Sequence, residues 1–195
     1  LVQAKIGARQ VPAFDVSVAC SGFIYGLAIA NQFIGSGAYK HALVIAAEKL
    51  SGITDWSDRS TCVLFGDGAA AAVLGPVERG GILSVHLGAD GRAGDLIKLP
   101  AGGSRIPATK DSIDNKLHFI KMSGTELFKH AVKIMAEAAL EATRPLGLKA
   151  EDLSLVIPHQ ANIRILNAVA KRMGLAHDKI YLNIDRYGNM SAASS

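Results

Sequence analysis

Residues 15–27, DVSVACSGFIYGL, contain the change of pattern that decides the fold. The stretch PAFDVSVA (12–19) predicts a strand, and the long apolar run after it predicts a buried helix over about 20–34 that Gly35-Ser36-Gly37 ends. A buried strand that leads directly into a buried helix is typical of an α/β protein.

The same alternation of strands and helices continues along the chain. Two helices are predicted, an amphipathic one over 123–145 and a second over 161–174. Strands are predicted at 41–48, in two short pieces around the Gly-Asp-Gly turn of 62–75, from 81–90 onward, at 153–160 and at 179–184. The charged segment GPVERGG (75–81) resembles a linker between two parts.

Composition favours a closely packed protein. Of the 195 residues 49% are hydrophobic and 19% charged, and the uncharged stretch over 16–39 is interrupted by five polar residues and four glycines, which favours a buried strand and helix over a membrane span. Two cysteines make no disulfide framework, so the expected compartment is the cytoplasm.

Charge is unevenly distributed between the two parts of the chain. Residues 1–80 hold six basic and six acidic residues, whereas 81–195 hold fifteen and eleven, so the net charge of +4 lies in the second part. This mild excess favours an acidic protein or a phosphate-bearing ligand over nucleic acid. The chain begins in an apparent helix tail (1–9) and stops where another helix starts, so we expect further residues of the protein at both ends.

Three residues are candidates for chemistry. Cys20 stands where a strand gives way to a helix, where unpaired backbone N–H groups and the helix dipole favour a thiolate. His159 stands in the loop VIPHQAN after a predicted strand, and Asn189 follows a glycine turn. Taken singly, each has an ordinary interpretation: a buried inert thiol, a structural histidine and a turn asparagine.

Together these residues lie in four ordered blocks. The blocks are DVSVACSGFIYGL, FGDGAAAAVLG (65–75), PHQANIRIL (158–166) and DRYGNMSAAS (185–194). Their order and spacing closely resemble the active-site blocks of the β-ketoacyl-acyl carrier protein synthase III family, over essentially the whole chain. One departure is Met190, where the family usually has Thr.

The resemblance implies an acyltransferase of fatty acid biosynthesis. Cys20 would take an acyl group from acyl-CoA, and His159 and Asn189 would stabilise the enolate formed when malonyl-acyl carrier protein loses carbon dioxide. The carbanion would then attack the acyl-Cys20 thioester. Elongating synthases resemble a Cys-His-His arrangement, whereas a Cys-His-Asn set resembles type III synthases or chalcone-synthase-like enzymes. The strings PHQAN and CSGF favour the type III synthases.

Further positions match the family with less weight. Arg59 in SDRST matches a residue that stacks on the adenine of coenzyme A, although a solvated surface arginine is the alternative. The resemblance implies an acyl pocket at Phe65, Met122 and Gly124, although core packing would equally explain Met122. For carrier-protein docking it suggests Arg164, with Lys171, Arg172 and Lys129 extending a basic patch. The FGDG turn is not a phosphate loop, because no Lys and Ser/Thr follow it.

The implied fold is thiolase-like α/β: two similar halves, each a sheet flanked by helices, in a layered αβαβα arrangement that this chain would contain incompletely. Residues 1–80 would be the end of the first half with the nucleophile helix, and 81–195 most of the second. The resemblance further implies a homodimer, no cofactor besides the substrate acyl-CoA, no metal, and no nucleic-acid or membrane partner.

Three other functions share these residues. A related synthase could make polyketides, alkylquinolones or long-chain ketones, since the acyl pocket decides the product. A cysteine hydrolase would also need Cys, His and Asn but would release a free acid. A non-catalytic remnant would only bind partners, and Cys20 would then not label with acyl-CoA.

Overall fold

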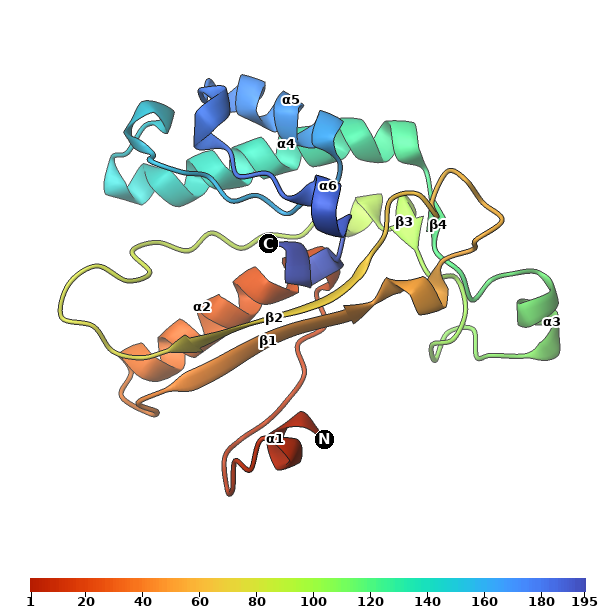
Figure 1. Ribbon diagram of the computed structural model, residues 1–195, viewed down its shortest axis with the longest axis horizontal. Coiled ribbons are helices and arrows are strands. Elements are labelled where there is room, and N and C mark those ends of the chain that lie inside the picture. Colours follow the sequence, from red (N-terminus) through yellow and green to blue (C-terminus); the bar gives the residue numbers. More distant parts are fainter.

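A long antiparallel hairpin and the helix that packs on it form the first layer of the protein. The computed structural model describes residues 1–195. Strand β1 (Ala42–Lys49) pairs with β2 (Asp67–Leu74) in a continuous register from Ala42–Leu74 to Lys49–Asp67. The preceding helix α2 (Gly22–Gly35) lies along this hairpin (Figure 1).

A pair of long helices forms the second layer. Helix α4 (Gly124–Thr143) packs against α5 (Ile163–Met173), and the two lie side by side (Figure 1). Their contact is apolar, since Ala136 of α4 is fully buried and packs with Ile165 and Val169 of α5. The predicted helices over 123–145 and 161–174 are therefore confirmed, because a helical apolar stripe needs only one facing partner to become buried.

Short elements connect and flank these layers. Strand β3 (Ile97–Lys98) pairs with β4 (Lys121–Met122), and the single-turn helices are α1 (Val2–Lys5), α3 (Lys110–Asp114) and α6 (Ile184–Tyr187). The 3₁₀ turns are η1 (Ala19–Ser21), η2 (Leu50–Ile53), η3 (Gly91–Ala93), η4 (Arg144–Leu146), η5 (Ala150–Asp152), η6 (His177–Lys179) and η7 (Ser191–Ser194). At the carboxyl end, η7 packs against both η1 and the hairpin.

Several predicted strands do not form. Residues 12–18 and 81–90 are irregular, and the pattern over 62–75 gives one strand, β2, rather than two. The stretches 153–160 and 179–184 touch through a single parallel bridge between Val156 and Ile180. An apolar run becomes a strand only where a neighbour completes its hydrogen-bond ladder, and these segments have no such neighbour in the structure.

The uncharged stretch over 16–39 is divided between an irregular segment, the η1 turn and α2. No helix in the structure combines the length and the apolar character that crossing a bilayer requires.

Candidate active site

Cys20 occupies the 3₁₀ turn η1, directly before α2, and its side chain is half-buried. The residue before it, Ala19, has a positive φ of 46°, so the chain turns sharply at this point. Close approach explains the glycine that follows: a Cβ at Gly22 would lie 3.3 Å from Cβ of Ala192 in η7. The start of α2 is thus held against the carboxyl-terminal turn.

The ionisation of Cys20 differs from the sequence expectation. Burial raises the pKa of the thiol above its ordinary value; a hydrogen bond from the Ser191 side chain lowers it, and the Glu48 carboxylate raises it further. The start of a helix was expected to favour the thiolate. Burial of Cys20 outweighs that effect, because removing a charged sulfur from water is costly. At neutral pH the resting residue is the thiol.

His159 lies in the loop before α5 and faces η7. Its Nδ1 atom is 3.1 Å from the Ser194 hydroxyl, and its Nε2 atom has no partner in the structure. Burial lowers the pKa of His159 to about 4, and a backbone contact with Ser191 opposes this shift. The imidazole is therefore neutral at physiological pH and can offer a hydrogen bond without carrying a charge.

The neighbouring Gln160 fixes this loop. Its side chain is 1% exposed and donates to the carbonyls of Pro158 and Tyr181 at 2.9 and 3.1 Å. The side-chain Oε1 accepts from the backbone N–H of Asn183 at 3.0 Å. The backbone N–H of Gln160 donates to the Ser194 carbonyl, also at 3.0 Å. A buried amide with every group bonded restricts the loop that presents His159.

Asn189 is 8% exposed and is anchored through its main chain and its side-chain oxygen. Its N–H donates to the Leu64 carbonyl and its carbonyl accepts from Gly66, both at 2.9 Å, around the isolated bridge with Phe65. The Oδ1 atom accepts from the Ser191 N–H at 2.9 Å. These contacts leave the Nδ2 amide without a partner in the structure, so it can donate to a ligand.

One element therefore collects the three candidates from distant parts of the chain. Cys20 lies in η1, which packs against η7, and its carbonyl accepts from the Ser195 hydroxyl, directly after η7, at 3.3 Å. Asn189 Oδ1 accepts from the N–H of Ser191, and His159 Nδ1 lies 3.1 Å from the hydroxyl of Ser194; both serines belong to η7. Two unpaired donors can be provided here, Nε2–H of His159 and Nδ2 of Asn189. A thiol nucleophile with two neutral donors suits acyl transfer through an oxyanion.

Sequence reasoning did not single out Ser191, Ser194 or Gln160. The one signal for them is position, since they lie within a few residues of Asn189 and His159 in the two most specific blocks. Serine and glutamine are common residue types, so composition does not mark the residues that hold a catalytic group.

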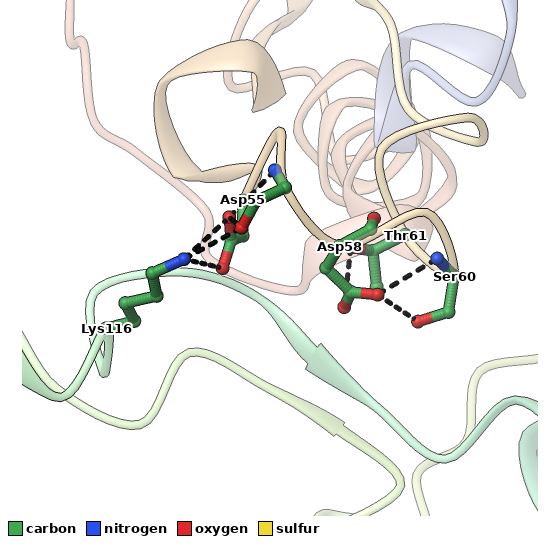
Figure 2. Close-up of polar contacts among 6 residues, drawn as sticks. Asp55, Asp58, Ser60, Thr61 and Lys116 are labelled. Carbon is green, nitrogen blue, oxygen red and sulfur yellow. Dashed lines mark hydrogen bonds and ion pairs between the residues drawn. The ribbon is translucent and has the colours of Figure 1, made fainter.

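Arg59 lies on a turn that several side-chain hydrogen bonds hold in place. Asp55 accepts from the N–H and hydroxyl of Ser57 at 3.0 and 2.6 Å, and Asp58 accepts from those of Ser60 at 2.9 and 2.6 Å (Figure 2). The hydrogen bonds from Ser57 lower the pKa of Asp55 to about 2, with Lys116 also contributing.

The Arg59 side chain is exposed and forms no ion pair. From the other side of the turn, the Lys116 ammonium lies 3.1 Å from the Asp55 carboxylate and 2.7 Å from the Ser57 hydroxyl (Figure 2). The turn thus presents Arg59 from a rigid backbone.

The predicted acyl-pocket residues are not gathered into one described cavity. Phe65 and Met122 are half-buried, and Gly124 is exposed at the start of α4. A mostly apolar cavity of about 450 Å³ instead lies between 63–64, 161–163 and 182–188. Its lining does not include the three predicted residues, whose role stays a prediction.

The basic residues predicted for docking lie on the surface. Arg164, Lys171 and Arg172 of α5 and Lys129 of α4 are all exposed, while Ile165, Leu166 and Val169 of α5 are buried as expected. Arg172 forms an ion pair with Glu137 at 3.2 Å, whereas the other three cations form none. No cluster of His, Cys, Asp and Glu side chains has the arrangement of a metal site.

Comparison with known proteins decides the family. The model of the 3-oxoacyl-[acyl-carrier-protein (ACP)] synthase III family matches residues 14–91, and the model of its C-terminal part matches 144–195. The chain belongs to this family. Both matched ranges contain candidate residues, Cys20 in the first and His159 and Asn189 in the second.

Similar proteins extend over the whole chain. It is 57% identical to the β-ketoacyl-[acyl-carrier-protein] synthase III of Caldanaerobacter subterraneus subsp. tengcongensis and 54% identical to that of Clostridioides difficile, in each case over 100% of this chain and 59% of the relative. The chain thus spans about three fifths of the length of these relatives.

Solved structures of the family share the fold. The synthase III of Aquifex aeolicus superposes with a TM-score of 0.87 at 48% identity, and that of Pseudomonas aeruginosa with 0.89 at 37%. Each match covers 99% of this chain and 58% of the other. The predicted thiolase-like α/β fold is therefore confirmed, with this chain covering part of it.

Proposed function

We propose that the whole protein catalyses the initiating condensation of fatty acid synthesis. In this reaction an acyl-CoA primer and malonyl-acyl carrier protein give a β-ketoacyl-acyl carrier protein, with release of carbon dioxide and coenzyme A. The observation that carries this proposal is the convergence of Cys20, His159 and Asn189 on the η7 turn and the residue after it.

The first half-reaction is transfer of the acyl group to Cys20. Its sulfur attacks the acyl-CoA carbonyl carbon, a C–S bond forms, and the coenzyme A thiolate leaves with the proton that Cys20 loses. Because burial raises the pKa of the Cys20 thiol, deprotonation accompanies the attack rather than preceding it. Sulfur suits both half-reactions, since a thiolate is a good nucleophile and a good leaving group.

The second half-reaction forms the carbon–carbon bond. His159 Nε2–H and Asn189 Nδ2 donate to the malonyl thioester oxygen, and the bond to the carboxylate breaks to give an enolate and carbon dioxide. The enolate carbon attacks the acyl-Cys20 carbonyl, and the Cys20 thiolate leaves. A neutral imidazole suits this role, because its N–H can stabilise the oxyanion as a preorganised donor. His159 does not have to take up a proton before the reaction, which its lowered pKa would disfavour.

The remaining assignments belong to the same proposal. Arg59 would contact the coenzyme A adenine, and Phe65, Met122 and Gly124 would line the acyl pocket. Residues 1–80 and 81–195 would belong to the two halves of the thiolase fold. The whole protein would be a cytoplasmic homodimer that needs no cofactor besides its substrates.

The decisive experiment uses the full-length protein with a panel of acyl-CoAs and malonyl-acyl carrier protein. Mass spectrometry of the products should show a β-ketoacyl-carrier protein that carries the primer plus two carbons. Cys20→Ala should abolish it. Release of free acid without a condensation product would instead indicate a hydrolase.

Two substitutions separate the half-reactions. His159→Ala and Asn189→Ala should each lower malonyl decarboxylation by about 10²–10³, the usual cost of losing one oxyanion donor. Acylation of Cys20, followed by intact-protein mass spectrometry, should stay measurable in both variants. Near-native decarboxylation in both variants would contradict the assigned roles.

A further inference from the structure

The Ser194 hydroxyl lies between two groups of the candidate site. Its Oγ atom is 3.1 Å from His159 Nδ1 and 2.9 Å from the carbonyl oxygen of Ser191. The residue is 6% exposed, so water cannot readily replace either contact. Its main chain is also fixed, because the Ser194 carbonyl accepts the N–H of Gln160.

A hydroxyl has one proton and can donate to only one of these two acceptors. If Ser194 donates to the Ser191 carbonyl, its oxygen accepts from Nδ1–H, and the neutral His159 has a bare Nε2. If Ser194 donates to Nδ1, the imidazole proton is on Nε2. The two arrangements differ in the direction of the hydroxyl and in the tautomer of the ring, so changing one into the other takes rotation of the hydroxyl and transfer of the ring proton from Nδ1 to Nε2. The direction of the hydroxyl therefore sets whether Nε2, which has no protein partner, meets the substrate as donor or acceptor.

We propose that Ser194 is a positioning residue whose hydroxyl donates to His159 Nδ1 and thereby keeps the imidazole proton on Nε2. The inference rests on the proposed function, in which Nε2–H stabilises the enolate oxygen. Developing negative charge beside Nε2 favours the same arrangement, because a bare nitrogen lone pair would repel it. Without the hydroxyl, Nδ1 loses the donor that holds its lone pair, so the proton is no longer confined to Nε2.

The test is Ser194→Ala in the full-length protein. Decarboxylation of malonyl-carrier protein should fall by roughly tenfold or more, up to the 10²–10³ expected for loss of the donor itself. Acylation of Cys20 by acyl-CoA should change much less. In ¹⁵N spectra of histidine-labelled protein, the proton of His159 should move from Nε2 toward Nδ1. Ser194→Thr keeps the hydroxyl and should restore most of the decarboxylation rate.

A matched control is Ser112→Ala. Ser112 is 3% exposed, and its hydroxyl donates to the carbonyl of Thr109 and accepts from the N–H of Thr109 in the capping box of α3, far from η7 (Figure 1). Ser112→Ala therefore also removes a buried, bonded hydroxyl. Equal losses in the two alanine variants, or an unchanged His159 tautomer in Ser194→Ala, would overturn the proposal. If the wild-type protein itself does not condense acyl-CoA with malonyl-carrier protein, the proposed function fails instead, and the ¹⁵N spectra still test the contact between Ser194 and His159.

Discussion

At the scale of single residues, the candidate site is flanked by two residues with unusual backbone angles. Ala19, next to Cys20, has a φ of 46°, and Ser191, whose N–H donates to Asn189 Oδ1, has a φ of 51°. A non-glycine residue in this region costs of order 1–3 kcal/mol and persists only where its surroundings impose it. Both residues lie where η1 packs against η7, so this backbone strain falls at the junction that holds the candidate site.

The two cysteines should differ in reactivity. Cys20 lies in the turn against η7, whereas Cys62 lies in the braced turn that follows Asp58. Treatment of the full-length protein with an acyl-CoA should add one acyl group at Cys20, because only this cysteine lies against the turn that also contacts His159 and Asn189. Peptide mass spectrometry reads the position. Acylation confined to Cys62 would refute the assignment of the nucleophile.

The pH profile of decarboxylation should report His159. Its pKa is lowered to about 4 by burial, so the protonated fraction becomes substantial only as pH falls toward that value. The decarboxylation rate, followed by carbon dioxide release, should therefore show no His159 transition between about pH 8 and 5. An acidic loss of rate centred near the ordinary histidine value of about 6.5 would show that the imidazole is not held neutral.

At the scale of elements, helices were predictable and most strands were not. The stripe formed by Ile165, Leu166 and Val169 predicts α5 correctly, because helical hydrogen bonds are internal to the segment. The segments at 153–160 and 179–184 have equally clear apolar patterns but meet through one bridge. A strand depends on what lies beside it, and that information is not local.

The packing of α5 makes a direct prediction. Leu166 is fully buried with Ala170 and Ile180, so Leu166→Ala should lower the free energy of unfolding by about 2–5 kcal/mol. Denaturant titration of the full-length protein measures this change. Asn167→Ala, at the adjacent exposed position, is the matched control and should change stability by less than about 0.5 kcal/mol. Similar effects of the two substitutions would show that α5 does not pack as described.

At the scale of the whole molecule, the four blocks predicted which residues meet but not what holds them. Cys20 and His159 are 139 residues apart, and nothing local to either of them indicates contact with one turn. The block resemblance supplied that information. It did not supply the Ser194 contact or the raised pKa of Cys20, because both depend on side-chain burial that appears only when η7 packs on η1.

The surface beside the site carries exposed cations. Arg164 is exposed at the first turn of α5, five residues after His159. Like Lys171 and Lys129, it forms no ion pair. Arg172 is partly neutralised by Glu137 and should contribute less. A carrier protein that is acidic would be attracted to these cations, which would raise its association rate.

Arg164→Glu should therefore lower kcat/KM for malonyl-carrier protein severalfold or more and change acylation of Cys20 by acyl-CoA much less. The helix itself should tolerate the change, because a carboxylate near a helix N-terminus is favourable and Asn162 still accepts the backbone N–H of residue 164. Raising the salt concentration should shrink the difference from wild type, since solvent-exposed charges are screened over about 10 Å at 0.1 M. Lys110→Glu, the same charge change on α3, should have little effect on either half-reaction. If Arg164→Glu impaired both half-reactions equally, Arg164 would have a structural role or a role in binding coenzyme A, and the carrier-docking prediction would be wrong.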